Sequence, residues 1–515
     1  MTVRQLLQAL AKALPPDQHL ALPPGAGGLD ATYTGITHDS RSVGAGTLFV
    51  ALKGLKADGV GFAAQAIAAG AAAVVAERQP GDSRLRHGSG EAGGDVPWIV
   101  VSDARLALAL LAAEFHGHPS REMPVVGITG TNGKTTTAYL VSAIFEAAGM
   151  RPGLMGTVVY RIGTREFAAT RTTPEAPDVQ GFLRQMVDAG SRACVMEVSS
   201  HALALRRVDG IRFAAAVFTN LTRDHLDFHG DMESYFTAKR RLFDMLPAGA
   251  PALINADDPR AAALIEMPGT PVTYGITRPA DARPGPLSFT IDGLAFDVTT
   301  PRGTVRVRSK LVGRPNVYNI LAAVGTTAAL GVPLEAIEQG LLQLPGVPGR
   351  FELASRLGED DIVVVIDYAH TDDALRNLLE TARPLASRGL ITVFGAGGDR
   401  DRTKRPLMGM VAARLSDLVV ITSDNPRSED PERIIEEVKR GAAPETRQRN
   451  AEVVAIADRR DAIQHAIDRA GAGDMVLIVG KGHEKYQEIN GHVHPFDDVA
   501  VAREALAARR VRRAG

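Results

Sequence analysis

The sequence predicts an α/β protein of three domains, with a P-loop ATPase-like parallel sheet in the centre and a Rossmann-like doubly wound sheet at the C-terminus. Two observations carry this prediction. Short apolar runs alternate with helical patterns over most of the chain, and its 515 residues exceed the roughly 250–300 that one hydrophobic core sustains. We expect the domains to span residues 1–103, 104–345 and 346–515.

Composition narrows the class of protein. Hydrophobic residues make up 45% of the chain and charged residues 23%, as in an ordinary soluble globular protein. The net charge of −1 provides no general attraction to nucleic acid or to an anionic membrane. Cys194 is the single cysteine, which excludes an intrachain disulfide and suits a reducing compartment. No apolar run approaches the roughly 20 residues that cross a bilayer. We therefore expect a cytoplasmic protein without membrane insertion or a nucleic-acid partner.

The first domain begins with an amphipathic helix, MTVRQLLQALAKALPPD, that lacks a signal-peptide cleavage region. The stretches TGITHDSRSVGAGTLFVALKG and FAAQAIAAGAAAVVAE predict strands followed by an alanine-rich helix. Residues 78–95 are polar and rich in glycine, which is typical of a surface loop. VPWIVV then predicts a buried strand with Trp98 in the core.

The second domain opens with a helix, SDARLALALLAAEF, for which Ser102 or Asp103 is the expected N-cap. Strands are predicted at MPVVGIT, ACVMEV, AAAVFTN and PALIN, and helices at TTTAYLVSAIFEAAG and SYFTAKRRLFDML. Beyond the turn-rich residues 344–350, the third domain repeats the alternation. Five buried strands are predicted there, at DIVVVIDYA, LITVFGAGG, DLVVITSD, AEVVAIAD and MVLIVGKG, and the chain ends in a helix with a basic, solvated end.

The stretch GITGTNGKTTT, residues 127–137, resembles a phosphate-binding loop between a strand and a helix. It departs from the strict G-x-x-x-x-G-K-[ST] spacing, because Ile128 stands where the first glycine is expected. The context still suits phosphate: backbone N–H groups converge at glycines, the helix N-terminus is electropositive, Lys134 reaches outer phosphates and Thr135 can bind Mg²⁺. The loop predicts ATP or GTP binding through Gly130, Thr131, Asn132, Gly133, Lys134, Thr135 and Thr136.

Other polar residues are ambiguous when taken alone. Glu197 follows a predicted strand, where it is either a Mg²⁺ ligand or an exposed strand-end acid. Histidines 225 and 229 lie close together in NLTRDHLDFHGD, but neither a cysteine nor an H-E-x-x-H pattern supports zinc. Lys239 in TAKRRLF has the pattern of a solvated helix face, and DNPR (424–427) that of a proline turn after a strand.

Nine motifs, taken in order, remove much of this ambiguity. They are TGTNGKTTT, MEVSSHAL, NLTRDHLDFHGDMESYFTAKRRLF, LVGRPNVYNI, GVPGRFE, DYAHT, GAGGDRDRTKRPLM, SDNPRSEDP and GKGHEKYQ. Together they resemble the Mur ligases of peptidoglycan synthesis over nearly the whole chain, and they are most similar to the diaminopimelate-adding branch. Members of that family use TGTNGKT, so the unusual loop spacing is part of the resemblance.

The resemblance implies a ligase that couples ATP hydrolysis to amide formation through an acyl phosphate, with Mg²⁺ as cofactor. It implies that Lys134, His225 and a Lys239 carbamylated by CO₂ are catalytic. The implied metal site comprises Thr135, Glu197, His225 and Lys239. Asn319, Arg350 and Asp367 match positions around ATP, and His229 is left open as a structural residue.

The substrate residues are also implied by the resemblance. Those for UDP-N-acetylmuramoyl-L-alanyl-D-glutamate are Ser40, Leu55, Lys56, Ala57, Thr172, Thr173, Ser199 and Arg207. The sequence departs from the family at DGVGF, which lacks the usual histidine, and at Leu205, which is polar in some relatives. Those for meso-diaminopimelate are Arg400, Asp424, Asn425, Pro426, Arg427, Gly480 and Glu484.

Four alternatives are kept beside this interpretation. A lysine-adding Mur ligase and a folylpolyglutamate synthase-like ligase are disfavoured by the DSR-type first domain and by DNPR. A P-loop switch or transport ATPase would not need the amino-acid site of the third domain. A catalytically inactive precursor binder is disfavoured because Lys134, Thr135, Glu197 and Lys239 are all present. We expect the protein to be a monomer.

Overall fold

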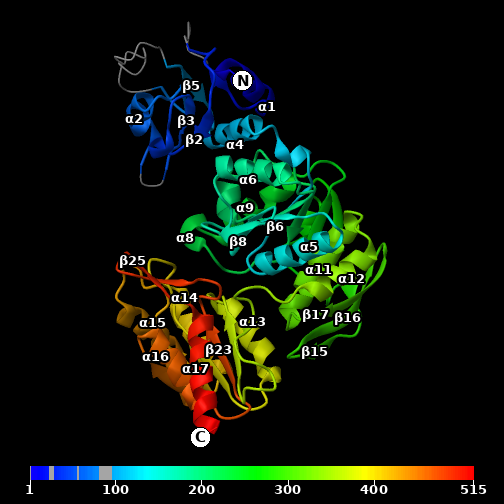
Figure 1. Ribbon diagram of the computed structural model, residues 1–515, viewed down its shortest axis with the longest axis vertical. Coiled ribbons are helices and arrows are strands. Elements are labelled where there is room, and N and C mark those ends of the chain that lie inside the picture. Colours follow the sequence, from blue (N-terminus) through cyan, green and yellow to red (C-terminus); the bar gives the residue numbers. More distant parts are fainter. Residues whose placement is uncertain (1, 22–27, 55–56, 80–95, 450, 515) are drawn as a thin grey trace.

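Three large sheets organise the chain, one in each of three successive units (Figure 1). This computed structural model describes residues 2–21, 28–54, 57–79, 96–449 and 451–514. The N-terminal unit lies at one end of the molecule, the central unit in the middle, and the C-terminal unit at the other end (Figure 1). The predicted three-part α/β fold is confirmed, and most of the predicted loop at 78–95 lies outside the described residues.

The first sheet has the order β1-β5-β4-β3-β2, parallel except for the pair β1–β5. The helices α1 and α4 cover one face, and α2 covers the other, where Trp98 is buried as predicted. The elements are β1 Leu20–Ala21, β2 Gly35–Thr37, β3 Thr47–Ala51, β4 Ala73–Ala76, β5 Trp98–Val101, α1 Val3–Ala13, α2 Ala63–Ala68 and α4 Ala104–Phe115, with 3-10 turns η1 Ser40–Ser42 and η2 Gly59–Phe62.

The N-cap of α4 is Asp103, whose carboxylate accepts hydrogen bonds from the backbone N–H groups of Arg105 and Leu106. This carboxylate satisfies two of the donors that every helix start leaves free. The helix packs on α1 and also on α6 (Ala176–Asp188) of the central unit. It therefore connects the first sheet to the second as a packed element.

The central sheet has eight strands in the order β13-β12-β11-β6-β10-β7-β8-β9, parallel except where β7, β8 and β9 turn back on one another. The helices α5, α11 and α12 contribute to one core, and α6, α7 and α9 to the other. The strands are β6 Val125–Thr129, β7 Gly153–Met155, β8 Val159–Ile162, β9 Arg165–Ala168, β10 Cys194–Glu197, β11 Ala215–Phe218, β12 Pro251–Asn255 and β13 Thr270–Tyr274. The other helices are η3 Pro119–Arg121, α5 Lys134–Ala147, α7 Ser200–Ala204, α8 Leu226–His229, α9 Met232–Asp244, α10 Ala261–Ile265, α11 Arg314–Ala329 and α12 Leu334–Gln343.

A small antiparallel sheet, which the sequence analysis did not predict, lies between the central sheet's last strand and α11 in chain order. Its long strand β16 buries alternate residues, and these join the same core as α5, α11 and α12. Its strands are β14 Arg283–Pro284, β15 Ser288–Thr290, β16 Gly293–Thr300 and β17 Gly303–Ser309.

The C-terminal sheet has the order β18-β19-β23-β20-β21-β22, with only β18 antiparallel. The helices α13, α14 and α15 lie over one face and α16 and α17 over the other (Figure 1). The strands are β18 Glu352–Leu353, β19 Val363–Asp367, β20 Leu390–Phe394, β21 Leu418–Ile421, β22 Glu452–Ala455 and β23 Met475–Val479, followed by the hairpin β24 Tyr486–Ile489 and β25 His492–Pro495. The helices are α13 Asp372–Ala382, η4 Arg383–Leu385, α14 Lys404–Leu415, α15 Pro431–Arg449, α16 Arg459–Arg469 and α17 Asp498–Ala514.

Two expectations about this unit are corrected. The prediction of five buried strands is wrong for β22, which pairs only with β21 at the sheet's edge and leaves both end residues exposed. The basic end of α17 is not simply solvated, because Arg509 and Arg513 both form ion pairs with Asp361. A valine-rich run indicates a strand but does not show whether a neighbour covers it.

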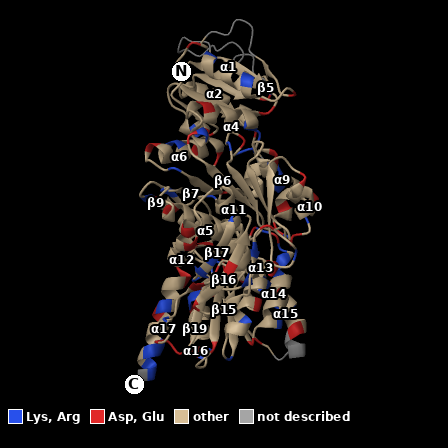
Figure 2. Cartoon of the chain, turned by 90° about the vertical axis from the view of Figure 1, so that its right-hand side faces the viewer, with Lys and Arg blue, Asp and Glu red and all other residues tan. Residues whose placement is uncertain are grey.

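Charges of both signs are interspersed over the molecule, and no face seen in Figure 2 carries one sign alone. Among the helices of the described ranges, none combines the length and the apolar character that crossing a bilayer requires. The surface is therefore consistent with the near-zero net charge.

We expect Leu253→Ala to lower the free energy of unfolding by about 2–5 kcal/mol, because Leu253 is fully buried in β12 beneath α11. Urea unfolding followed by fluorescence would measure the change. The control is Leu342→Ala on α12, where the side chain is 58% exposed and the expected change is within about 0.5 kcal/mol. Equal effects of the two substitutions would contradict this account of the core.

Candidate active site

The loop at residues 130–133 joins β6 to α5, so its backbone N–H groups surround the N-terminus of that helix. Gly130 and Gly133 have φ angles of +142° and +88°. A Cβ atom at Gly133 would lie 2.4 Å from Oδ1 of Asn319, and one at Gly130 only 1.8 Å from Oγ1 of Thr219. Both positions therefore require glycine for conformation and for close approach.

The segment after β11 forms hydrogen bonds with the loop at residues 130–133. The backbone N–H of Thr131 donates to the carbonyl of Asn220 (2.8 Å), and that of Asn132 donates to the Asn220 side chain (3.0 Å). The hydroxyl of Thr219 donates to the carbonyl of Asn132 at 2.6 Å. These bonds fix the loop in a shape that leaves the α5 N-terminus free to meet an anion.

Two lysine ammonium groups meet at one backbone carbonyl of the loop. Lys134 donates to the carbonyl of Gly130 at 2.9 Å, and Lys239 of α9 donates to the same oxygen at 2.8 Å. Lys239 is 1% exposed, and its Nζ lies 4.4 Å from the centroid of the Tyr235 ring. Burial, with the neighbouring Lys134 charge, lowers the pKa of Lys239 well below its usual value. Lys239 is therefore buried, and does not lie on a solvated helix face as its local sequence pattern suggests.

Glu197, at the carboxyl end of β10, is buried at the centre of a hydrogen-bond cluster. One carboxylate oxygen accepts from the hydroxyls of Thr135 and Thr157, each at 3.0 Å. The other accepts from the backbone N–H of Thr157 at 2.7 Å. Thr157 also contacts Thr172 at 3.0 Å between hydroxyls, so the cluster reaches from the phosphate loop to the segment before α6.

His225 precedes α8 in a left-handed conformation, with φ of +54°. Its backbone N–H donates to Asp224 at 2.9 Å, and its ring lies 4.8 Å from that of His201. Burial lowers the pKa of His225 to about 3, so the imidazole is neutral near pH 7. His229 contacts the hydroxyl of Ser200 at 2.9 Å and packs on Tyr235, which gives it a packing role in this cluster.

Residues of the C-terminal unit reach the phosphate loop directly. The guanidinium of Arg350 donates to the hydroxyl of Thr135 at 3.3 Å and stacks over the Tyr368 ring at 4.5 Å. The side chain of Asn132 donates to Asp373 at the start of α13 (3.0 Å). Tyr368 in turn packs on His483, with ring centroids 5.0 Å apart. One line of contacts therefore joins the central sheet to the loop that follows β23.

Asp367 and Asn319 have local hydrogen-bond partners. Asp367, at the end of β19, accepts from the backbone N–H groups of Phe351 and Ala369, both at 2.8 Å, and burial raises its pKa. The Asn319 side chain accepts from Thr137 at 3.4 Å and donates to Asn316 at 2.9 Å. Asp367 therefore positions the chain at Phe351, the residue after Arg350.

The residues predicted for the dipeptide form a continuous set beside Glu197. The hydroxyl of Thr173 donates to the Glu197 carbonyl at 2.9 Å and accepts from the Ser199 N–H at 3.1 Å. Arg207 donates to the Thr173 carbonyl at 3.2 Å and pairs with Glu175 at 2.6 Å. Thr172 joins the same set through Thr157, so the structure brings these four predicted residues together.

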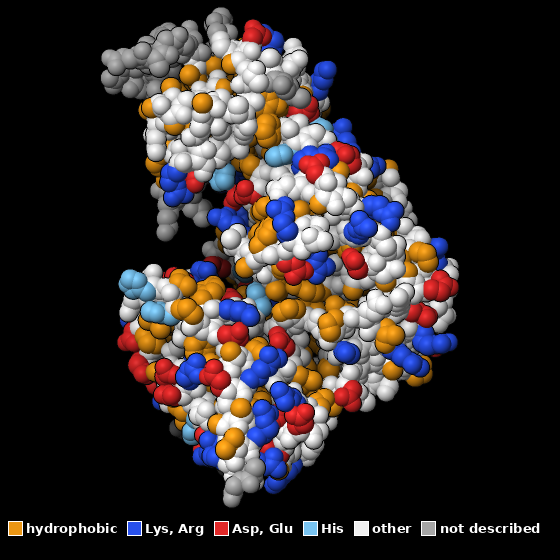
Figure 3. Space-filling model, in the orientation of Figure 1, with side chains coloured by type: hydrophobic (Ala, Val, Ile, Leu, Met, Phe, Trp, Pro, Cys, Tyr) orange, Lys and Arg blue, Asp and Glu red, His pale blue; other side chains and the backbone are white. Residues whose placement is uncertain are grey.

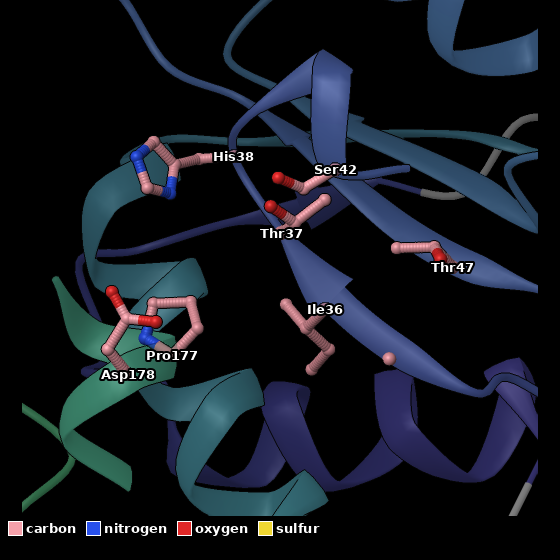
Figure 4. Close-up of a pocket in the computed structure, with 8 residues that line it drawn as sticks. Ile36, Thr37, His38, Ser42, Thr47, Pro177 and Asp178 are labelled. Atoms are coloured by element: carbon pink, nitrogen blue, oxygen red, sulfur yellow. The ribbon is translucent and has the colours of Figure 1, made fainter. Parts of the chain in front are cut away.

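Two of the predicted N-terminal residues contact other residues of the first unit. Ser40 donates to Gln65 at 3.2 Å, Ala57 lies in a turn with Gly54, and Leu55 and Lys56 lie outside the described residues. Beside Ser40, a pocket opens between the first sheet and the start of α6 (Figure 4). It is lined by Gly35, Ile36, Thr37, His38, Ser42, Thr47, Pro177 and Asp178. Polar side chains of both units face this pocket.

A second cluster lies at the carboxyl ends of β21 and β23. The Asn425 side chain donates to Glu484 at 2.9 Å and accepts from the Glu488 backbone N–H at 3.0 Å. Gly480 has φ of +111°, and a Cβ there would lie 2.5 Å from an Asp424 oxygen. Burial and the Asp424 charge raise the pKa of Glu484. The structure thus brings Asp424, Asn425, Gly480 and Glu484 into one site.

Two arginines border this cluster. Arg427 has φ of +53°, and its guanidinium donates to the Gly398 carbonyl at 2.6 Å and lies 3.4 Å from Glu488. Its backbone is held by β24, since its N–H donates to the Glu488 carbonyl at 3.0 Å. Arg400 is exposed and donates to the Asp399 carbonyl at 3.1 Å. The carbonyl of Pro426 lies against Gly398, whose own carbonyl accepts from Arg427.

Sequence reasoning missed two residues of these clusters. Thr157 makes two of the Glu197 hydrogen bonds, and its signal was its place just after a short strand. Lys481 is fully buried and donates to Asn425 at 3.0 Å, with Glu484 3.5 Å away. It lies inside the GKGHE motif that was assigned only through Gly480 and Glu484.

Three protein-family models match successive parts of the chain. The Mur ligase family catalytic domain matches residues 32–116, the Mur ligase middle domain matches 128–327, and the Mur ligase glutamate ligase domain matches 349–482. The chain belongs to the Mur ligase family. A diaminopimelate-adding ligase of Geobacter sulfurreducens, named UDP-N-acetylmuramoyl-L-alanyl-D-glutamate–2,6-diaminopimelate ligase, is 48% identical over 502 residues, covering 94% of this chain and 96% of the relative. One of the same name from Gloeobacter violaceus is 48% identical over 484 residues, covering 94% and 96%.

Solved structures show the same fold. A structure of a UDP-N-acetylmuramoyl-L-alanyl-D-glutamate–2,6-diaminopimelate ligase has a TM-score of 0.67 and 34% identity, covering 99% of both chains. The folylpolyglutamate synthase of Mycobacterium tuberculosis, solved with ADP and AMPPCP, has a TM-score of 0.61 at 19% identity, covering 74% of this Mur ligase and 92% of that chain. The second likeness is one of fold alone.

We expect Gly133→Ala to weaken ADP binding by at least about tenfold, because a methyl group would displace Asn319 and deform the loop. Isothermal titration calorimetry would measure it. Gly190→Ala is the control, since Gly190 has a similar φ of +81° with nothing within 4 Å of its Cβ position. Unchanged binding by the Gly133 variant would contradict the loop's role.

Proposed function

We propose that this Mur ligase joins meso-2,6-diaminopimelate to UDP-N-acetylmuramoyl-L-alanyl-D-glutamate, with ATP as the energy source. The observation that carries the proposal is the C-terminal cluster, in which Arg427 borders the buried acid Asp424 and the partly buried acid Glu484. Such a site complements an amino acid with an ammonium group and a second, distant carboxylate. Ligation extends the peptide of a cytoplasmic peptidoglycan precursor.

The central cluster suits activation of the precursor's carboxylate. That carboxylate attacks the γ-phosphate of ATP, and ADP leaves with the bridging oxygen, so an acyl phosphate forms. Lys134 at the phosphate loop and Arg350 at 3.3 Å from Thr135 supply positive charge where the transferred phosphoryl group moves. Arg207, beside Thr173, suits a carboxylate or phosphate of the precursor.

The amine of diaminopimelate then attacks the acyl carbon. The tetrahedral intermediate collapses with loss of phosphate, the amine loses a proton, and an amide bond remains. This step needs the amine and the acyl phosphate to be held together without water. The line of contacts from Thr135 through Arg350 and Tyr368 to His483 supports such alignment between the two units.

Mg²⁺ fits the central cluster. The hydroxyl of Thr135 and a carboxylate oxygen of Glu197 lie 3.0 Å apart, and both are hard oxygen donors at the edge of the phosphate loop. Within the described ranges, no three acids, histidines or cysteines gather into a dedicated metal cage, which agrees with the few protein ligands that Mg²⁺ takes beside phosphates. When bound, the ion would neutralise phosphate charge. Neutral His225 and modified Lys239 complete the proposed set.

The surroundings of Lys239 support the proposal that it is carbamylated. A neutral amine is the form that adds to CO₂, giving a carbamate anion and a proton, and the lowered pKa of Lys239 favours that form. The change also turns repulsion between the Lys134 and Lys239 ammonium groups into attraction. Tyr235 packs beside Lys239, and both residues are 1% exposed.

Both clusters and the contacts between them are built from one chain. That the protein acts as a monomer stays a prediction. The substrates are the nucleotide-linked dipeptide, diaminopimelate and ATP. Figure 3 shows a hollow between the N-terminal unit above and the C-terminal unit below, on the side where the three substrates would meet.

We expect phosphate release from ATP to require both the UDP-linked dipeptide and diaminopimelate, with L-lysine at least about 10²-fold less efficient in kcat/KM. The reason is that lysine lacks the carboxylate that Arg427 would bind. Arg427→Met should reduce the preference for diaminopimelate over L-lysine. Arg433→Met, at an exposed position of α15, should leave that preference unchanged. Equal use of L-lysine by the wild type would refute the assignment.

We expect Lys239→Ala to lose at least about 10²-fold in kcat, because a buried charge next to the phosphates is removed. Added bicarbonate should not restore the activity. Lys239→Arg, which places a permanent cation at this position and cannot form a carbamate, should be similarly impaired. A carbamate signal from ¹³C-bicarbonate in the wild type, absent in both variants, is the direct measurement. Near-normal turnover of Lys239→Arg would exclude the carbamate's role.

A further inference from the structure

One fully buried charge outside the two clusters is Arg459, an arginine that the proposed chemistry leaves unused. Arg459 opens α16, and its side chain is 0% exposed, as is that of its partner Asp498 at the start of α17. Two hydrogen bonds of 2.8 and 2.7 Å join the guanidinium to the two carboxylate oxygens. Removing two charges from water is costly, and replacement by apolar residues is often neutral or stabilising, so stability alone is a weak reason for this pair.

The remaining donors of Arg459 point at the sheet. One Nη atom donates to the carbonyl of Ser423 at 3.3 Å, and the other donates to the carbonyl of Val479 at 3.0 Å. Ser423 directly precedes Asp424, and Val479 directly precedes Gly480. The Arg459 side chain therefore forms hydrogen bonds with both backbone segments that lead into the proposed diaminopimelate site.

These two segments are not neighbours in the sheet. β20 lies between β21 and β23, so their axes are roughly 10 Å apart at the usual strand spacing. A single planar guanidinium can reach both carbonyls only if the two chains converge beyond the end of β20. The order of the strands thus makes Arg459 a bridge across a third strand.

The glycine after β20 shows that the chains do converge. A Cβ atom at Gly395 would lie 2.4 Å from the Thr422 carbonyl oxygen and 2.7 Å from the Asp424 nitrogen. The chain leaving β21 therefore crosses closely over the end of β20. On the far side, the Cβ position of Gly480 lies 2.5 Å from an Asp424 carboxylate oxygen.

We propose that Arg459, anchored by Asp498, is a positioning residue that sets the spacing of Asp424 and Gly480 and thereby the affinity for the amino-acid substrate. The inference rests on the proposed function of that site. A site that recognises both ends of an amino acid tolerates little change in spacing, because each of its polar groups must meet a fixed partner. Arg459 does not touch the substrate; it acts through the two strand ends.

The decisive variant is Arg459→Lys, which keeps a buried cation beside Asp498 but replaces the planar fork by one ammonium group. We expect KM for diaminopimelate to rise about tenfold, with KM for ATP and for the UDP-linked dipeptide within about twofold of wild type. Calorimetric titration of diaminopimelate into the nucleotide-bound enzyme should show the same loss. An unchanged KM for diaminopimelate, or an equal rise in all three KM values, would overturn the proposal.

The matched control is Arg509→Lys. Arg509 pairs with Asp361 at the amino end of the same sheet, where its side chain is 13% exposed. It should leave all three KM values unchanged. A second variant, Arg459→Met with Asp498→Leu, removes the bridge without leaving a buried charge unpaired. If this variant folds and binds diaminopimelate more weakly, the proposal is supported. Wild-type affinity for diaminopimelate would overturn it. If the wild type itself does not ligate diaminopimelate, the proposed function fails. This outcome differs from failure of the Arg459 proposal, in which the wild type ligates diaminopimelate and the variants have the wild-type KM for it.

Discussion

The carboxylate of Glu197 is the interaction on which the central unit depends. It is buried, it carries three hydrogen bonds from Thr135 and Thr157, and its own backbone carbonyl accepts from Thr173. The start of α5, the segment after β7 and the segment before α6 therefore meet at one residue of β10. A buried anion needs such compensation, so each partner is held in place by the cost of leaving Glu197 unpaired.

The same buried anion balances a concentration of positive charge. Lys134 and Lys239 share the Gly130 carbonyl, and Arg350 approaches Thr135 from the C-terminal unit. Lys134, Arg350 and the helix N-terminus give a strong field for phosphate. Burial, together with repulsion by the Lys134 charge, lowers the pKa of Lys239 and favours its neutral form. Charge placement, more than any nucleophile, is what this site provides.

The sequence predicted the central and C-terminal sheets and the strand–turn–helix order around Lys134 and Thr135, because strand periodicity and glycine-rich turns are local signals. It could not predict the edge position of β22, the added sheet around β16, or the ion pairs of α17, since these depend on what packs beside each segment. Lys239 shows the limit most clearly. Its local pattern indicates a solvated helix face, yet the fold buries it against Gly130, more than one hundred residues away.

The two clusters also differ in how they are held. The central one is completed by groups from another unit, through Arg350 and through Asp373 at Asn132. The C-terminal one is tied within its own sheet, by Lys481, by β24 and by the Arg459 bridge. Selection between similar amino acids needs fixed distances, whereas phosphoryl transfer needs an approach that admits ATP and releases ADP. The proposed selecting site, tied within its own sheet, and the proposed nucleotide site, completed by Arg350 and Tyr368, meet these two requirements in one chain.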